Sequence, residues 1–396
     1  MRSFVAVAAL VSALVVQAGG ASGQISDGAL GEQRIALVLA TWGPQPVDVA
    51  AARQAVDETA AFVREASFGK TWLSVDVKGW LRALTRRPTG CDVQGVNETI
   101  QRSVDLTDYD LVAYLVPRLD CPWTGAYYPP GVWMLGEISK NLFAHELGHN
   151  WGVREEGPAW VCGRPCAAEN YADPYSVMGH GSGHFGAFEK WRFGWIERVG
   201  PVLEDGEYEI ARIDRPSTRP HALYVLSGAE EYWVEYRPEV PWPVVHAGAS
   251  TVRVTPSRFP QRNLLLAGAR SARFAVAGAF EVVRTGADDE RMSLRFRWTD
   301  RTRPARPRIE SRVAGRTVTL RFPAADTGSG VERYELAVGR GIRVAVPTSE
   351  LQGRELVGRD AFFRVRLGRG AHRVAVTAID RAGNRSPTAT RTVRIP

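Results

Sequence analysis

Long apolar segments are nearly absent from this chain of 396 residues. The exception is an apolar run over residues 4–16, which follows Arg2 and precedes small residues at 18–23. This run is too short to span a bilayer, so we expect residues 1–23 to be a signal peptide that is removed on export. Because no other segment is long and apolar enough for a membrane helix, the sequence predicts a secreted protein with no membrane span.

Cysteine is scarce as well, with four residues, all in the first half of the chain. An even number in an exported protein indicates two disulfides rather than an all-cysteine zinc site. Pairing by proximity joins Cys91 to Cys121 and Cys162 to Cys166, which is one of three connectivities. The sequence leaves the choice among them open.

Lysine occurs only four times, so arginine carries nearly all of the positive charge. Residues 301–396 hold 20 Arg against 8 acidic residues, a net charge of +12, which leaves −5 for the rest of the chain. Two explanations fit such a tail equally. One is an arginine-rich, solvated β surface, and the other is docking on an anionic cell-surface polymer. No nucleic-acid-binding motif accompanies the charge, so we expect no nucleic acid partner.

Histidine is also rare, with seven in the chain, yet two of them stand four residues apart in His-Glu-Leu-Gly-His-Asn-Trp-Gly at 145–152. Positions i and i+4 share a face of an α-helix, so His145 and His149 can direct ring nitrogens at one metal ion, with Glu146 beside it. Gly152 can adopt the positive φ that ends the helix and turns the chain. The alternative is a helix that carries two histidines by chance. The spacing favours a zinc hydrolase site.

Hydrophobic periodicity divides the rest of the chain into an α/β unit and two β units. Apolar runs at 34–42 and 110–117 predict buried strands, and residues 47–66 show apolar positions at helical spacing. Beyond residue 200, short alternating segments with turn residues between them are typical of β-sandwiches. We therefore expect a multidomain protein with a signal peptide at 1–23, an α/β catalytic domain at 24–199, a β-sandwich at 200–300 and a second β-sandwich at 301–396.

The segment at 127–137 has two interpretations. It is either an ordinary core strand or an edge strand that faces a cleft. An edge strand would bind substrate backbone by strand addition, a mode that gives affinity with little side-chain selectivity.

Three stretches together resemble the metzincin clan of zinc peptidases, and within it the gametolysin family: residues 145–152, Ser-Val-Met-Gly at 176–179 and Ala-Ser-Phe-Gly-Lys at 66–70. The resemblance covers about residues 34–195. It implies a metzincin-like fold for the α/β unit. It also implies that His145 and His149 ligate zinc, that Glu146 is the catalytic base, that Gly152 matches the motif's glycine and that Met178 packs beneath the metal.

The family's motif has a third histidine three residues after its glycine, and this chain has Glu155 at that position. A carboxylate can ligate zinc beside two histidines, so Glu155 is the expected third ligand, with Glu156 as its rival. A thermolysin-like arrangement would instead take Glu169 from a second helix. A further alternative is a non-catalytic surface-binding protein in which the protease domain has decayed, because the expected third histidine is missing.

Asp-Thr-Gly-Ser-Gly-Val at 326–331 and Asp-Arg-Ala-Gly-Asn at 380–384 resemble fibronectin type III or immunoglobulin-like modules appended to exported bacterial enzymes. The sequence as a whole predicts a secreted zinc-dependent endopeptidase that acts on extracellular or cell-wall proteins. Three protein ligands leave one zinc position for water, whose proton Glu146 takes as the oxygen attacks a peptide carbonyl. The expected cofactor is one catalytic Zn²⁺, and the expected partner is a protein or peptide substrate.

Overall fold

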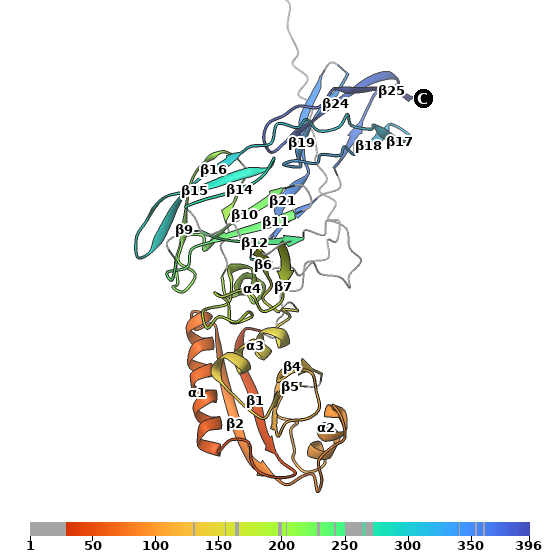
Figure 1. Cartoon of the computed structure of the whole chain (residues 1–396). Coiled ribbons are helices and arrows are strands. Elements are labelled where there is room, and N and C mark those ends of the chain that lie inside the picture. The colour runs from red at the N-terminus through yellow and green to blue at the C-terminus, as the bar shows by residue number, and fades with distance from the viewer. Residues whose placement is uncertain are drawn as a thin grey trace, which may run out of the picture.

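A computed structural model describes residues 29–129, 131–154, 156–162, 166–196, 200–202, 204–227, 230–240, 243–249, 264–265, 272–339, 341–352, 355–358 and 361–396. The expected signal peptide at 1–23 lies outside these residues. The described chain is mostly β-structure and forms three units in a row, with the first unit at one end and the C-terminal unit at the other (Figure 1). None of its described helices is long and apolar enough to cross a membrane.

The first unit is built on a five-stranded sheet. Its parallel part grows from continuous apolar runs, which suit strands that are buried on both faces. The strands, in their order across the sheet, are β2 (Thr71–Leu81), β1 (Gly31–Ala40), β3 (Leu111–Val116), β5 (Gly131–Leu135) and β4 (Gly125–Tyr128). All neighbours pair in parallel except β4, which runs antiparallel to β5 and forms one edge of the sheet.

Helices cover both faces of this sheet. Alternate residues of β1 divide between two cores: Leu37 packs with α1 (Val49–Ala66) and α3 (Lys140–Asn150), whereas Val38 packs with α2 (Val93–Gln101). The period-two alternation of a strand thus separates two helical layers. The helix α3, which contains both histidines of the motif, lies on the same side as α1 and next to β4.

Residues 127–137, which had two interpretations, contain parts of two strands. Strand β5 is completely buried between β3 and β4, so this part is an ordinary core strand. Tyr127 and Tyr128 end the edge strand β4 and are exposed. The apolar run of β5 explains its interior place, since an edge strand of that composition would expose apolar side chains.

One of the two expected disulfides is confirmed. Cys91 and Cys121 form a bridge that ties the chain before α2 to the loop after β3. Cys162 and Cys166 are backbone partners across the hairpin of β6 (Ala159–Cys162) and β7 (Cys166–Glu169). Their side chains lie outside the described part of the structure.

The middle unit consists of two sheets that enclose one apolar core. The larger sheet has the order β7-β6-β13-β12-β11-β10-β8, with β13 (Leu264–Leu265), β12 (Val244–Ala249), β11 (Glu230–Glu235), β10 (Ala222–Ser227) and β8 (Gly200–Pro201). The smaller has the order β14-β15-β16-β9, with β14 (Arg273–Val276), β15 (Phe280–Ala287), β16 (Arg291–Trp298) and β9 (Gly206–Ala211).

The larger sheet crosses the domain boundary that was expected at residue 199. It includes the β6–β7 hairpin of the first unit, since β6 pairs with β13. In addition, the short helix α4 (Ala187–Arg192) packs its Phe188 against Trp233 of β11. The first and middle units therefore share a continuous, buried interface.

The C-terminal unit consists of sheets that enclose one apolar core. One sheet has the order β17-β18-β23, with β17 (Glu310–Ala314), β18 (Thr317–Arg321) and β23 (Phe362–Arg366). The other has the order β20-β19-β24-β25, with β20 (Ile342–Pro347), β19 (Val331–Val338), β24 (Gly370–Asp380) and β25 (Ala389–Ile395). A hairpin of β21 (Ser349–Gln352) and β22 (Glu355–Gly358) adds a small third sheet.

Candidate metal centre

Helix α3 carries both histidines into the interior of the first unit. Ser139 caps the helix, its hydroxyl accepting a hydrogen bond from the backbone N–H of Leu142. His145 and His149 lie one turn apart on the same face, and their Nε2 atoms are 3.0 Å from each other. The chain turns at Gly152, whose φ is +100°, so that the residues after the helix return toward the two imidazoles.

Backbone carbonyls determine the tautomer of both rings. His145 Nδ1 lies 3.1 Å from the carbonyl oxygen of Val177, and His149 Nδ1 lies 2.8 Å from that of Val153. A carbonyl oxygen only accepts, so each Nδ1 carries a proton and donates it. In the neutral ring, Nε2 then offers its lone pair.

Glu156 completes the cluster from the loop that follows α3. Its Oε2 lies 2.9 Å from His145 Nε2 and 3.3 Å from His149 Nε2. The loop comes this close because two glycines meet: a Cβ on Gly157 would collide with the backbone of Gly179. Because Gly157 and Gly179 have no side chains, the loop can approach closely enough to place the Glu156 carboxylate beside the two imidazoles.

The three converging atoms fit a metal ion. Two neutral Nε2 atoms and a carboxylate oxygen all accept, so they repel one another unless a cation lies between them. Zinc bonds of about 2.0–2.2 Å to nitrogen and oxygen, in tetrahedral geometry, separate neighbouring ligand atoms by about 3.3 Å. The separations in this cluster are 2.9, 3.0 and 3.3 Å. His145, His149 and Glu156 therefore form a set that zinc can occupy.

Burial works against ionisation of Glu156, but the neighbouring imidazoles and Tyr171 outweigh it and hold the pKa of Glu156 below the ordinary range. Burial also works against protonation of His149, yet the Glu156 carboxylate raises the pKa of that ring, because a positive charge there relieves the same repulsion between acceptors that a metal ion would relieve. The carboxylate thus stays ionised and ready to bind a cation.

Glu146 faces the edge strand β4. Only 3% of the residue is exposed, and its Oε2 is completely buried without a hydrogen-bond partner among the described residues. Gly125 on β4 leaves room for it, since a side chain at that position would meet the Glu146 carboxylate. Burial raises the pKa of Glu146 to about 7. A carboxyl group with such a pKa can both accept and release a proton near neutral pH.

Tyr171 belongs to the site and was missed by sequence reasoning. Its backbone N–H donates to the carbonyl oxygen of Glu156 at 2.5 Å, and its ring stacks near His145 with a centroid separation of 5.8 Å. Its φ of +60° is unusual for a bulky residue, and such conformations cluster at functional sites. The residue is half exposed, so the phenol borders both the cluster and solvent. Strand β7, which precedes it, brings it to the site, and no spacing rule predicts this.

Met178 lies on the inner side of α3. It is fully buried against Gly148, where a Cβ would collide with its sulfur. Phe185 touches the same glycine. The helical turn between His145 and His149 therefore rests on apolar side chains, which keeps the face with both imidazoles in place.

A buried network of charges ties the loop under α3 to the middle unit. Asp173 accepts hydrogen bonds from the backbone N–H of Tyr175 at 2.8 Å and from His246 Nε2 at 3.0 Å. Burial opposes both charges, but the attraction is stronger, so the pKa of Asp173 is lowered and that of His246 is raised. Arg237 pairs with Glu235 at 2.5 Å and donates to the carbonyl of Tyr175 at 2.7 Å. These contacts between distant segments have no sequence signature.

The other expected donors lie elsewhere. Glu155, the expected third ligand, is outside the described residues. The thermolysin-like alternative requires Glu169 on a helix, whereas Glu169 is the exposed last residue of strand β7 and does not join the cluster. Glu156 is thus the carboxylate that the described structure brings to the histidines.

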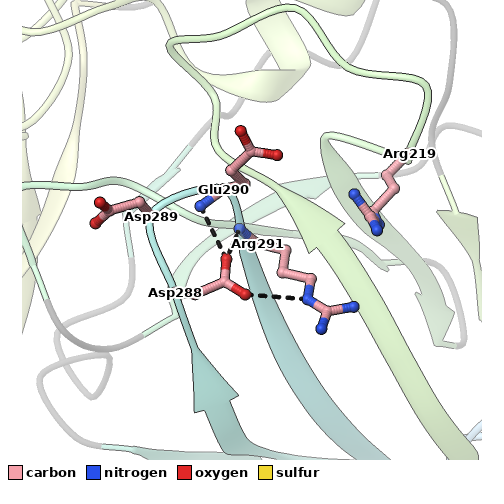
Figure 2. A pocket seen from close by; sticks show the side chains of 5 residues that line it. All are labelled: Arg219, Asp288, Asp289, Glu290 and Arg291. Carbon is pink, nitrogen blue, oxygen red and sulfur yellow. Dashed lines mark hydrogen bonds and ion pairs between the residues drawn. The ribbon is translucent and has the colours of Figure 1, made fainter.

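A separate hollow of about 640 Å³ lies on the middle unit, where Figure 2 shows three acidic and two basic side chains. Asp288 accepts from the backbone N–H groups of Glu290 and Arg291 and pairs with the Arg291 guanidinium. Its lining is formed by the charged residues of a solvated turn, with Arg219 opposite. Its lining includes none of His145, His149 and Glu156.

No protein-family model matches the sequence, and no curated protein matches it. Solved structures resemble parts of the chain. The PKD1 domain of the Vibrio cholerae metalloprotease PrtV is 19% identical, with 24% of this chain and 98% of that chain covered and a TM-score of 0.19. The fibronectin(III)-like modules of Clostridium thermocellum CbhA are 12% identical, with 50% and 88% covered and a TM-score of 0.17. At such TM-scores these likenesses support no conclusion about the fold or the activity.

Proposed function

We propose that the protein is a secreted zinc-dependent endopeptidase of the metzincin type, similar to the gametolysin family. The observation that carries the proposal is the convergence of His145 Nε2, His149 Nε2 and Glu156 Oε2 within 2.9–3.3 Å, beside the buried carboxyl group of Glu146. A structural helix has no need for three mutually repelling acceptors. The combination matches the ligands and the base of a zinc hydrolase.

In this proposal His145, His149 and Glu156 hold the metal. A bound zinc ion supplies a Lewis acid that polarises a substrate carbonyl and makes a water molecule more acidic. Glu146, whose pKa of about 7 suits proton exchange near neutral pH, would accept a proton from the attacking water and pass it to the leaving amine. The backbone N–H of Tyr171 donates to the Glu156 carbonyl oxygen and so helps to position this residue, as outer partners of metal ligands commonly do.

The proposed substrate is an extended segment of an extracellular or cell-wall protein. Strand β4 is the edge of the sheet nearest to α3, and Tyr127 and Tyr128 on it are exposed. An antiparallel edge offers backbone donors and acceptors to a peptide that adds as a further strand. Gly125 on the same strand lies against Glu146, so a peptide bound there would run past the proposed base.

Export is part of the proposal. The apolar run at residues 4–16 supports it. The Cys91–Cys121 disulfide supports it as well, because disulfides persist in oxidising compartments. We also propose an anionic cell-surface polymer as a partner of the C-terminal unit. This part of the proposal rests only on the arginine-rich sequence of that unit.

The decisive experiment compares Glu146→Gln with the wild-type protein in zinc content and in hydrolysis of unfolded casein. The variant is expected to bind about one zinc per chain and to lose hydrolysis, because the amide cannot accept the proton. Glu98→Gln on the exposed side of α2 is the matched control and is expected to keep full activity. Full activity of Glu146→Gln would refute the assigned base.

The same assays decide between the alternatives. Wild-type protein that binds zinc without hydrolysing casein would support a non-catalytic binding protein. Glu156→Ala is expected to lose zinc while Glu169→Ala keeps it. The opposite result would support the thermolysin-like ligand set.

A further inference from the structure

Three aspartates meet where the middle unit joins the C-terminal unit. Asp300 follows β16, Asp326 lies in the loop between β18 and β19, and Asp380 ends β24. One oxygen from each carboxylate lies within 4.8 Å of the other two. The cluster therefore combines one residue next to the middle unit with two from the C-terminal sandwich.

The surrounding backbone holds these carboxylates together. Asp300 accepts hydrogen bonds from the backbone N–H and the hydroxyl of Ser329, at 2.6 and 2.8 Å. Gly328 is needed beside it, because a Cβ there would collide with the Asp300 carboxylate. The side-chain amide of Asn384 donates both to the Asp300 carbonyl oxygen at 3.1 Å and to the Asp380 carboxylate at 2.9 Å. Asp326 accepts through Oδ2 from the backbone N–H of Gly330 at 2.5 Å, so each of the three acids is held by a hydrogen bond.

Burial makes the cluster costly in the absence of a cation. Asp300 is 5% exposed and Asp380 is fully buried. An independent observation concerns Asp326: its Oδ1 is completely buried and has no hydrogen-bond partner among the described residues. Arg381, which donates to the carbonyl of Ser329, brings one positive charge near three negative ones. Like charges this close in a buried site repel strongly, and an unpartnered buried carboxylate oxygen adds a desolvation cost.

The three carboxylate donors favour calcium over zinc. All three groups are carboxylates, which are hard ligands that suit calcium, whereas protein zinc sites are rich in histidine and cysteine. Calcium–oxygen distances of about 2.3–2.6 Å allow two ligands of one ion to lie up to about 5 Å apart, in agreement with the 4.8 Å limit of this cluster. We propose that Asp300, Asp326 and Asp380 bind a calcium ion that fastens the C-terminal sandwich to the middle unit.

The position of the site gives the ion a structural role. Besides these bonds to Asp300, the Ser227 hydroxyl donates to the Gly328 carbonyl at 3.2 Å, and Ala382 packs against the core of the middle unit. A bound ion would add a link between Asp300 on one side and Asp326 and Asp380 on the other. Calcium would therefore strengthen the junction between the two units. This inference does not require the proposed peptidase activity, because the metal centre at α3 uses other residues.

The test is a calcium titration of the full chain by calorimetry and by thermal unfolding, with the same zinc concentration in every sample. The wild-type protein is expected to bind one calcium ion at this site, with a dissociation constant in the range of about 10⁻⁴–10⁻³ M that is typical of extracellular modules. Saturation is expected to raise the unfolding midpoint by about 5 °C. Asp326→Asn is expected to lose this binding, and Asp289→Asn in the exposed acidic turn of Figure 2 is expected to retain it.

A folding defect in Asp326→Asn is distinguished by the calcium-free samples. Without calcium this variant is expected to unfold at the same temperature as the wild type or higher, because the amide removes one of three repelling charges. With calcium the order is expected to reverse. The proposal is overturned if calcium up to about 10 mM leaves the wild type unchanged, or if it stabilises wild type and Asp326→Asn equally.

Discussion

Replacement of Asp173 by alanine tests whether the middle unit supports the loop under the candidate metal centre. Asp173 and His246 are each 1% exposed and lie 3.0 Å apart, so they form a buried ion pair between the two units. The same carboxylate accepts from the backbone N–H groups of Tyr175 and Ser176, at 2.8 and 3.3 Å. Alanine removes all three interactions at once.

The expected loss of stability is about 4 kcal/mol. Removal of one partner of a buried ion pair typically costs about 3–5 kcal/mol, because the remaining charge is buried without compensation. The freed N–H groups add to the cost, whereas a shift of the His246 pKa toward the neutral form reduces it. Asp173→Asn keeps an acceptor for the backbone and is expected to lose only about 1–2 kcal/mol.

Urea unfolding followed by tryptophan fluorescence measures these losses, and a thermal scan is expected to show a fall of about 10 °C for Asp173→Ala. Asp120→Ala is the matched control, because Asp120 pairs with Arg87 at 2.6 Å while both side chains are more than half exposed. Its loss is expected to stay below about 1 kcal/mol. If Asp173→Ala loses no more than this control, the buried network does not support the loop.

Two further predictions concern the same region. Gly148→Ala is expected to destabilise the protein by about 1–2 kcal/mol despite alanine's better helix propensity, since its methyl group collides with Met178 and Phe185; greater stability in urea would contradict this packing. Burial, together with the charges of Lys190 and Arg237, lowers the pKa of His184 to about 3. Between pH 6.5 and 3 the unfolded chain therefore binds a proton at this residue that the folded chain does not bind. Stability is therefore expected to fall with decreasing pH in this window by up to about 1.4 kcal/mol per pH unit, and His184→Gln is expected to make the urea-derived profile shallower; parallel profiles would contradict it.

Local patterns predicted the elements well where one interaction dominates. The apolar run that contains Leu37 indicated a buried strand, and β1 is one, because such a run is stable only between two covered faces. The two histidines share a helical face because the i, i+4 spacing leaves no other arrangement on a regular helix. The Cys91–Cys121 bridge also followed the shortest pairing.

Tertiary contacts decided what these patterns left open. Strand β5 lies in the interior of the sheet because β3 and β4 flank it. The sequence of residues 127–137 supported a core strand and an edge strand equally. Glu156 reaches the imidazoles through the close approach of Gly157 and Gly179, two positions far apart in the sequence. Tyr171 joins the same site through the fold of the β6–β7 hairpin.

The sequence by itself thus determined the buried strands, the helix with His145, Glu146 and His149, and the division into an α/β unit followed by β units. Each of these rests on the periodicity of neighbouring side chains, which one helix or strand expresses alone. Only the tertiary structure decided the partner of the histidines, the pairing of Asp173 with His246 and the meeting of Asp300 with Asp326 and Asp380. Those contacts join segments that are separated along the chain, and their geometry exists only after the units have packed together.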